Sequence, residues 1–362
     1  MFAQQEVVLY IHSLDLSQKK YLHVHGHSHD ITTLQDATIF CLEPADNDHF
    51  YLRMVPSLTC GDVGKKSLDI WDAQNPKLIL YAPNQHENQK FIISSSDMSI
   101  FTYDGRFLLT NEQPLFVQFV SRLRVMSFNI QECLNKEFGS LSWNDRASVS
   151  SYSKYESGRD IATLIQRFKP HVTCLQEYSN NNGCKALSKS RPATYSCGAD
   201  PGWRSLLQNP IILDGFKVVV EGQREDLADN RCFSYVGLEV PVVGHVLIVN
   251  IHVTFKQKYQ QNNVLILMNF ISKQLQQGTH IILTGDFNFK STSPLYDIIS
   301  QRLIPLTTQR IDHIFCSTGL MDAIKVQSCL SDASDHDPVM VEFRWADSTE
   351  RFQKMNHTFK VW

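Results

Sequence analysis

The distribution of apolar and polar positions divides the chain into two parts. Residues 1–120 contain short apolar runs that Gly, Pro, Asn and Asp interrupt, without a helical period, and this pattern predicts an all-β domain. After Arg122, apolar runs alternate with segments in which apolar residues recur at every third or fourth position, which predicts strands alternating with helices. We therefore expect an all-β domain at 1–120, an α/β domain at 121–346 and a short tail at 347–362.

Several elements of the second part can be placed from this pattern. Strands are predicted at 123–130 and 246–255, and helices at 157–168 and 262–278. The Ser-rich stretch at 140–158 is typical of a loop. The expected buried face of the last helix comprises Val264, Leu267, Met268, Ile271 and Leu275, and Gly278 ends that helix.

Polar side chains follow the apolar runs of the second part. In THIILTGDFNF, Asp286 and Asn288 stand two positions apart, and on an extended chain such residues point to the same side. A loop with an Asx turn is the alternative interpretation. Other runs end in the same way, at Asn129, Glu177 and His252. Because α/β folds place their chemistry at the carboxyl ends of strands, we expect these side chains to share one site.

Three segments of the first part resemble one another, namely KKYLHV at 19–24, KKSLDI at 65–70 and GRFLLT at 105–110. Their spacing of about forty residues is typical of an internal repeat. The repeat resembles that of the ricin-type β-trefoil, whose Q-x-W or Q-x-F element is matched once, by Gln89 and Phe91. A fascin-like trefoil would show a similar sequence repeat. The resemblance implies an all-β β-trefoil that targets the protein to a glycan, a lipid or another protein.

Six short motifs follow one another in the second part: SFNI, CLQE, NIHV, GDFN, RIDHIF and SDHDPV. Over residues 123–345 their order resembles the motif series of the endonuclease/exonuclease/phosphatase superfamily, the deoxyribonuclease I-like fold. The resemblance implies an α/β four-layer sandwich, in which helices flank two packed mixed sheets. It also implies a metal-dependent phosphoesterase.

Hydrolysis of a phosphodiester by in-line attack of water needs a cation, a base and donors for the charge that builds on the oxygens. Mg²⁺ prefers oxygen ligands and needs few carboxylates from the protein, and Mn²⁺ is a second candidate. The resemblance implies that Asn129, Glu177 and Asp335 hold the metal and that Asp286 and Asn288 orient or deprotonate the attacking water. It also implies that His252 and His336 contact the phosphate, with Asp312 behind His336. Asn209 and Arg231 are the residues that it implies for further phosphate binding.

The substrate is less constrained than the reaction. Only 25 residues separate Asn288 from His313, at a connection where abasic-site nucleases insert DNA-reading elements and bacterial sphingomyelinases insert an apolar hairpin. We favour a nuclease acting on nucleic acid. The alternatives are a phosphoinositide phosphatase, a sphingomyelinase-like phosphoesterase acting on phospholipid, or a catalytically retired trefoil-based binding protein. The retired enzyme is opposed by the presence of Glu177, Asp286 and His336 together.

Composition narrows the class of protein. The chain is 43% hydrophobic and 20% charged, with a formal net charge of −3, which is ordinary for a globular protein and excludes DNA binding by charge alone. The nine cysteines lack CxxC pairing and are typical of reduced thiols. The first residues lack the basic and apolar regions of a signal peptide, and no run is long enough to span a bilayer. We therefore expect a cytoplasmic protein, or one exported without a signal peptide.

Four histidines occupy alternate positions in HVHGHSH, at His23, His25, His27 and His29. On one strand they would share a face and could bind a transition metal. The glycine and serine within the run favour a turn instead.

Overall fold

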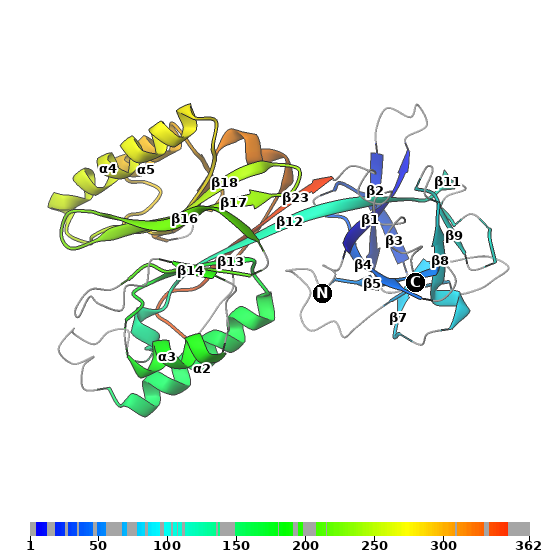
Figure 1. The fold of residues 1–362 in the computed structure, drawn as a ribbon, viewed down its shortest axis with the longest axis horizontal. Helices are drawn as coiled ribbons and strands as arrows, with labels where there is room; N and C mark the ends of the chain where they lie inside the picture. Colours follow the sequence, from blue (N-terminus) through cyan, green and yellow to red (C-terminus); the bar gives the residue numbers. More distant parts are fainter. Residues whose placement is uncertain are drawn as a thin grey trace. The chain divides into compact units, whose positions relative to one another are not determined.

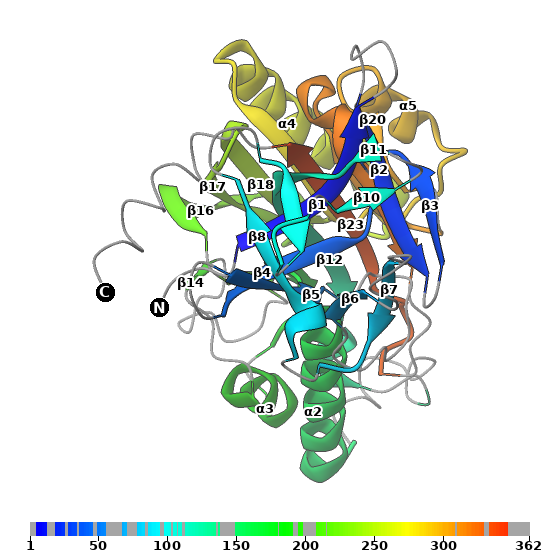
Figure 2. The same cartoon turned by 90° about the vertical axis from the view of Figure 1, so that its right-hand side faces the viewer.

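The chain, described here from a computed structural model, divides into two units, which Figures 1 and 2 show in two views. The β unit comprises Met1–Arg122 and Arg344–Trp362, and the α/β unit comprises Leu123–Phe343. The division falls within two strands, β12 (Phe116–Asn129) and β23 (Val339–Ala346). The structure describes residues 5–12, 19–25, 28–34, 36–45, 49–55, 67–70, 78–83, 86–94, 98–102, 104–106, 108–110, 113–134, 137, 149–179, 181–190, 195–197, 208–214, 216–307, 310–328 and 333–346, so the tail expected at 347–362 lies outside the described residues.

The β unit consists of strands over the residues that the structure describes, apart from one turn of 3₁₀ helix at Glu87–Gln89. Its described strand pairings are antiparallel. The all-β prediction is thus confirmed for the described part of the unit. Besides the first part of β12, its strands are β1 (Gln5–His12), β2 (Lys19–His25), β3 (Ser28–Thr32), β4 (Ile39–Pro44), β5 (His49–Met54), β6 (Ser67–Ile70), β7 (Leu78–Tyr81), β8 (Lys90–Ile93), β9 (Ile100–Thr102), β10 (Leu109–Thr110) and β11 (Gln113–Pro114).

The three similar segments of the β unit contribute equivalent leucines to one core. Leu22, Leu68 and Leu108 each stand fourth in their segment, and all three belong to the same buried cluster. Phe91 of the Q-x-F element lies in that cluster too, while Gln89 Nε2 donates a hydrogen bond to the Ala82 carbonyl at 3.0 Å. The sequence repeat therefore corresponds to a repeated contribution to one core, and the trefoil stays a prediction.

The histidine-rich run forms a hairpin and not a single strand. In the antiparallel pair of β2 and β3, His23 lies opposite Asp30 and His25 lies opposite Ser28. The chain therefore reverses between His25 and Ser28, as the glycine and serine predict. His27 lies outside the described residues.

The α/β unit alternates strands with helices along the chain, as the pattern predicts. Besides the ends of β12 and β23, its described elements are η2 (Gln131–Cys133), α2 (Ser151–Phe168), β13 (Val172–Gln176), α3 (Asn182–Ser190), β14 (Tyr195–Cys197), β15 (Ile211–Leu213), β16 (Lys217–Asp226), β17 (Cys232–Val240), β18 (Gly244–His252), α4 (Gln257–Gln276), β19 (His280–Asp286), α5 (Pro294–Ser300), β20 (Ile304–Pro305), β21 (Asp312–Cys316), η4 (Thr318–Ala323) and β22 (Ile324–Ser328).

Two mixed sheets form the centre of the α/β unit. The first sheet has the order β14-β15-β13-β12-β23-β22, with β12 and β13 parallel. The second has the order β16-β17-β18-β19-β21-β20, with β18 and β19 parallel. Helices α2 and α3 lie outside the first sheet, and α4 and α5 lie outside the second (Figure 1). The expected sandwich of two mixed sheets between helical layers is therefore present.

Two boundaries differ from the sequence prediction. Helix α2 begins at Ser151, so the second half of the stretch expected to be a loop is helical. The reason is local, because Ser150 caps the helix by accepting a hydrogen bond from the Ser153 amide at 3.1 Å. Strand β18 ends at His252 rather than at residue 255, and the following residues leave the sheet.

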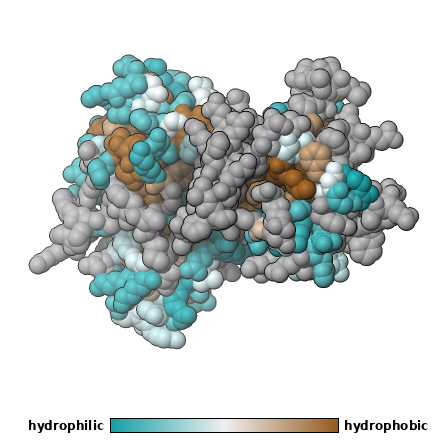
Figure 3. Space-filling model, turned by 45° about the vertical axis from the view of Figure 1, so that its right-hand side comes forward, coloured by the Kyte–Doolittle hydropathy of each residue, from teal (hydrophilic) through white to brown (hydrophobic). Residues whose placement is uncertain are grey.

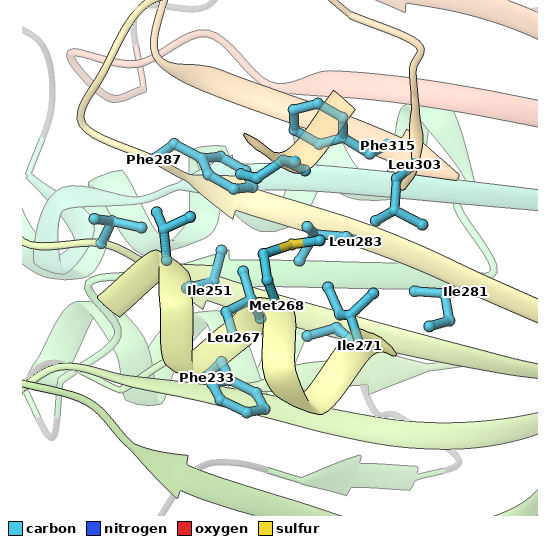
Figure 4. Packing of buried hydrophobic residues seen from close by; sticks show 14 of the residues in the cluster. Phe233, Ile251, Leu267, Met268, Ile271, Ile281, Leu283, Phe287, Leu303 and Phe315 are labelled. Atoms are coloured by element: carbon cyan, nitrogen blue, oxygen red, sulfur yellow. The ribbon is translucent and has the colours of Figure 1, made fainter. Parts of the chain in front are cut away.

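The core of the second sheet fixes the strands that carry its polar ends. Figure 4 shows Leu267, Met268 and Ile271 of α4 packed against Leu283 and neighbouring apolar side chains. The predicted buried face of α4 is confirmed, with Leu275 only partly buried. Full burial of each such side chain stabilises the fold by roughly 1.5–3 kcal/mol, so this core holds β18 and β19 firmly.

The described surface is largely polar on the face that Figure 3 shows, with apolar side chains in smaller areas. Among the described residues, no helix is both long and apolar enough to cross a membrane.

Candidate active site

Three neighbouring strands of the second sheet bring titratable side chains to one edge. His252 ends β18 and lies opposite Asp286, which ends the parallel strand β19. Asp286 in turn lies opposite Asp312, the first residue of the antiparallel strand β21. The three side chains therefore stand in one row across the sheet, at the carboxyl ends of its two parallel strands.

The glycine before Asp286 is required by the close approach of β18. Gly285 has a φ of 147°, and a Cβ atom there would lie 1.9 Å from the carbonyl oxygen of Ile251. Any side chain at this position would push the two strands apart. The G-D pair of the motif thus has a steric cause, which places Asp286 beside His252.

Asp286 is the centre of the site. Its Oδ2 accepts a hydrogen bond from Asn129 Nδ2 at 2.9 Å, and its Oδ1 accepts one from the Asn288 amide at 2.9 Å. The side chain is 2% exposed. Burial, and then the charge of Asp312, raise its pKa to about 7, against the opposing effects of His336 and the two hydrogen bonds. A carboxyl with such a pKa can accept a proton near neutral pH.

The bond from Asn288 to Asp286 is an Asx turn. The strand therefore ends at Asp286, and the expectation that both side chains face the same place along an extended chain is wrong. Asn288 has a φ of 52°, and its Nδ2 donates to the Val253 carbonyl at 2.8 Å. Asn288 thus positions Asp286 through its backbone and ties this turn to the end of β18.

His252 is held as a neutral imidazole. Arg231 Nη1 lies 3.2 Å from His252 Nδ1, and since a guanidinium can only donate, the ring hydrogen must be on Nε2. Burial, then the charges of Arg231 and His336, hold the pKa of His252 well below its usual range. Its Nε2 lies 3.5 Å from Asp286 Oδ2 and 3.9 Å from Glu177 Oε1, so the N–H points into the site.

His336 has the opposite charge state. Its Nδ1 lies 2.8 Å from Asp312 Oδ2, and its Nε2 lies 3.9 Å from Asp286 Oδ2. Burial disfavours the charged ring, but the hydrogen bond and charge of Asp312, followed by the charges of Asp286 and Asp335, outweigh it and raise the pKa of His336 to about 10. His336 is therefore an imidazolium at neutral pH, facing the same carboxylate as neutral His252.

Asn129 and Glu177 approach Asp286 from the first sheet. Asn129 ends β12, and its Nδ2 lies 3.4 Å from Glu177 Oε1 as well as contacting Asp286. Glu177 follows β13 directly and has a φ of 54°, a left-handed conformation that turns the chain out of the strand. The two sheets thus contribute facing oxygen and amide groups to one site.

The donor set fits a hard divalent cation on the Glu177 side. Glu177 offers a partly exposed carboxylate beside the buried Asp286, and oxygen donors of this kind suit Mg²⁺. Asp286, Asp312 and His336 also lie close together, with one donor atom of each within 4.8 Å of the others. Within that trio, His336 is hydrogen-bonded to Asp312 at 2.8 Å and lies 3.9 Å from Asp286, so a proton on the imidazole would compete with a metal ion for this position.

The remaining predicted residues divide into two groups. Arg231 joins the site through His252, and Asp335 lies next to His336, where its charge acts on the imidazole. Asn209 is buried, and its Nδ2 donates to the Cys232 carbonyl at 2.8 Å. Among the described contacts, none joins the Asn209 side chain to the other predicted site residues, so its role in binding phosphate stays a prediction.

The sequence analysis did not select Ser334, which joins the two halves of the site. Its hydroxyl donates to the Asn129 carbonyl at 2.8 Å and accepts from the His336 amide at 3.3 Å. The signal was present in the SDHD motif, where Ser334 precedes Asp335. Gln176 was not selected either, and its Nε2 bridges the two sheets by donating to Asn250 Oδ1 at 2.7 Å.

Comparison with known proteins identifies a family for most of the α/β unit. Residues 126–336 match the model of the Endonuclease/Exonuclease/phosphatase family. No curated protein sequence matches the chain. Similar solved structures include an endonuclease/exonuclease/phosphatase family protein from Bacteroides thetaiotaomicron, at 20% identity over 62% of this chain and 98% of that chain, with a TM-score of 0.48. A second is the mannosyl-6-phosphatase of Bacteroides thetaiotaomicron VPI-5482, at 20% identity over 60% of this chain and 98% of that chain, with a TM-score of 0.47. A third is the human Nocturnin catalytic domain with bound sulfate, at 18% identity over 62% of this chain and 94% of that chain, with a TM-score of 0.47.

Proposed function

This chain belongs to the endonuclease/exonuclease/phosphatase family, whose members are phosphoesterase hydrolases, and on that premise we propose that it is a metal-dependent phosphodiesterase that cleaves nucleic acid. One observation carries the proposal. A buried carboxylate, Asp286, lies between a neutral histidine and a cationic one, with Asn129 bonded to it. This arrangement offers a proton acceptor and donors of two kinds within one small volume.

Each group has a role that follows from its charge. Asp286 accepts a proton from the attacking water, and Asn129 and the Asn288 amide fix the direction of its oxygens. The Nε2–H of His252 donates to a non-bridging phosphate oxygen, with its tautomer fixed by Arg231. His336 brings a positive charge to the oxygens on which negative charge builds.

The metal is assigned to Glu177, with Asn129 and Asp335 as its neighbours. When bound, Mg²⁺ or Mn²⁺ would polarise the phosphate and neutralise developing charge. Asn129 Nδ2 contacts both Glu177 and Asp286, and so holds the Glu177 carboxylate beside Asp286.

Two features support nucleic acid over phospholipid. Arg231 contacts His252, and Lys256, which pairs with Asp229, lies four residues after His252. These cations suit a substrate with more than one phosphate, such as nucleic acid, better than a lipid with a single phosphate such as sphingomyelin. In the connection between Asn288 and His313, no large apolar side chain among the described residues is exposed. An apolar hairpin for entering a membrane is therefore not visible in the described part of this connection.

A substrate panel tests the proposal. Wild-type protein with Mg²⁺ is expected to hydrolyse bis-p-nitrophenyl phosphate faster than p-nitrophenyl phosphate, and then to cleave DNA or RNA in preference to phosphoinositides or sphingomyelin. The matched control is Asp286→Asn, which keeps the shape of the site. Equal, negligible turnover by both proteins would favour the catalytically retired, binding-only alternative, and faster hydrolysis of lipid would overturn the choice of substrate.

The β unit is proposed to be a β-trefoil that targets the enzyme to a glycan, lipid or protein ligand, in a cytoplasmic or signal-independently exported protein. The shared core positions of Leu22, Leu68 and Leu108 support the threefold repeat. Glycan-array and lipid-overlay binding by the isolated β unit would identify a glycan or lipid ligand, and an absence of binding in both assays would remove those two ligand classes.

A further inference from the structure

Phe255 is the exposed aromatic side chain nearest in sequence to a site residue. It is 64% exposed, although Val253 and Thr254 just before it are fully buried. The alternation of the sequence predicts that the strand continues through Phe255, yet β18 ends at His252. A single exposed apolar side chain is common on protein surfaces. What distinguishes Phe255 is its position three residues after His252, together with Lys256 Nζ, which lies 5.9 Å from the centroid of its ring.

The turn that carries Phe255 is fixed on both sides. Thr254 Oγ1 donates to Asp229 Oδ2 at 2.6 Å and accepts from the Lys256 amide at 3.2 Å. Gln260 Nε2 donates to the Thr254 carbonyl at 3.0 Å and to the Asn288 carbonyl at 3.1 Å. The backbone around the ring is thus held by side chains from two other segments, so the exposed position is built into the turn.

The same contacts hold the backbone of Phe255 close to the end of the strand that carries His252. Phe255 stands three residues after His252, and three residues of extended chain span at most about 10 Å. Asp229, which also accepts from Lys256 Nζ at 2.8 Å, is two residues before Arg231, and Arg231 contacts His252. The ring, an ammonium and a guanidinium therefore lie around the end of β18 that carries His252.

A planar base joined to a phosphate is the kind of ligand that fits an aromatic ring close to two cationic side chains. Stacking of one base on one aromatic ring changes affinity by about 5- to 150-fold and accepts every base, because each has a π face. Membrane insertion is the competing use, but it grows with buried apolar area. The residues that follow Phe255 are Lys256, Gln257 and Lys258, so a single ring would have to supply that area alone.

We propose that Phe255 stacks on the nucleobase adjoining the scissile phosphate and so makes the enzyme selective for unpaired nucleotides. The proposal rests on the proposed phosphodiesterase function and names its substrate more closely. Within a duplex the face of a base is covered by the neighbouring bases, so the Phe255 ring can stack only on a base in a single strand or at a strand end.

Two diesters with the same leaving group test the proposal. Thymidine 5′-(p-nitrophenyl phosphate) carries a base next to the phosphate, and methyl p-nitrophenyl phosphate does not. Phe255→Ala is expected to lower kcat/KM for the thymidine ester about 5- to 150-fold and to change the methyl ester less than about twofold. Phe255→Trp should retain the preference. An equal loss on both esters, or none on either, would overturn the stacking role.

The control variant removes an exposed apolar side chain in the turn that precedes β18, at the end of the strand away from His252. Val242 is 57% exposed in the turn before β18, at the end of that strand opposite His252, so Val242→Ala should leave both esters unchanged. If Phe255→Ala instead weakens sedimentation with phosphatidylcholine–phosphatidylserine vesicles and leaves the thymidine ester unaffected, the ring serves a membrane and the proposal is wrong.

A binding measurement separates this proposal from the function on which it rests. If the wild type hydrolyses neither ester with Mg²⁺, the proposed phosphodiesterase is wrong. The affinity of the Asp286→Asn protein for oligothymidylate, compared with an abasic polymer of equal length at one salt concentration, still reports on stacking. A preference for the bases that disappears with Phe255→Ala supports the role of the ring, and an equal affinity for both polymers refutes it.

Discussion

The Nδ1 atom of His336 lies 2.8 Å from Oδ2 of Asp312, and this contact leaves Nε2 directed toward Asp286. The carboxylate both orients the ring and keeps it charged. Asp312 Oδ1 is buried without a described hydrogen-bond partner, so its negative charge is stabilised chiefly through the imidazolium. The two side chains should therefore act as one unit.

A double-mutant cycle tests that unit. His336→Ala is expected to lower kcat about 10²–10³-fold, because it removes a charge from the transition state. Asp312→Asn should lower it less, and the double variant should be little worse than His336→Ala alone. Fully additive losses would show that Asp312 acts independently of His336.

The same pair sets the alkaline limb of the pH profile. Activity that needs the imidazolium is retained below the pKa of His336, about 10, and is lost as pH rises through it. Asp312→Asn removes the hydrogen bond and charge that raise this pKa, so the alkaline limb of kcat/KM should move to lower pH. An unchanged alkaline limb would contradict the assignment.

Asp286→Asn should lower kcat about 10²–10⁴-fold, because the general base is lost, while substrate affinity stays nearly the same. Single-turnover rates together with equilibrium binding of the substrate check both parts. A variant that loses affinity and keeps its rate would assign Asp286 to binding instead.

Asp286 should also make stability depend on pH. Its pKa is about 7 in the folded protein against 3.8 for an ordinary aspartate, so the folded state holds this proton more tightly. The resulting stability is complete below about pH 4 and is lost as pH rises to about 7. In chelator, the free energy of unfolding of the wild type relative to Asp286→Asn should fall by about 4 kcal/mol between pH 4 and pH 8. Urea denaturation measures this difference, and a constant difference would contradict the raised pKa.

Glu177→Ala should abolish Mg²⁺-dependent turnover and leave the fold intact, as should a chelator acting on the wild type. Glu177→Gln separates charge from shape, since it keeps the side chain's size but loses its negative charge. Calorimetric titration with Mn²⁺ gives a readout that does not depend on turnover. Full activity in chelator would remove the metal mechanism.

Gly285→Ala should destabilise the α/β unit by about 2–4 kcal/mol, because the added Cβ meets the Ile251 carbonyl at 1.9 Å. Gly244→Ala is the matched control. Gly244 also has a positive φ, of 90°, but a Cβ there has nothing within 4 Å, so only the backbone penalty of about 1 kcal/mol applies. Equal losses in thermal denaturation would show that conformation rather than strand spacing requires Gly285.

Residues 121–346 made alone are expected to fold and to hydrolyse bis-p-nitrophenyl phosphate at a rate close to that of the full chain. The fragment should be less stable, because Arg344 Nη1 donates to the Ala37 carbonyl at 3.0 Å in the full chain and loses that partner. Circular dichroism and turnover check both points. An insoluble fragment would place the boundary elsewhere.

Much of the fold follows from local pattern. The spacing of apolar residues in α4 predicted its buried face, because a helix of fixed period must turn those positions to the same side. The strand-end polar residues Asn129, Glu177, His252 and Asp286 were identified in the same way, since parallel strands of one sheet end at one edge. That the two sheets bring their edges together was decided by the packing of the sheets. The three similar segments of the β unit were also found from spacing, whereas the common core of their leucines came from the structure.

The tertiary structure alone decided how those residues are charged and where the chain leaves the sheet. His252 and His336 are the same side chain in different surroundings. Burial and then the charge of Arg231 hold the pKa of His252 well below its usual range, whereas the hydrogen bond and charge of Asp312 outweigh burial and raise the pKa of His336. Neither partner is adjacent in sequence, and a pKa depends on the distance to charges and on burial. The exposure of Phe255 was decided likewise by a hydrogen bond from Thr254 to Asp229, on a different loop. Sequence thus determined which residues reach the site, and long-range contacts determined what each of them can do there.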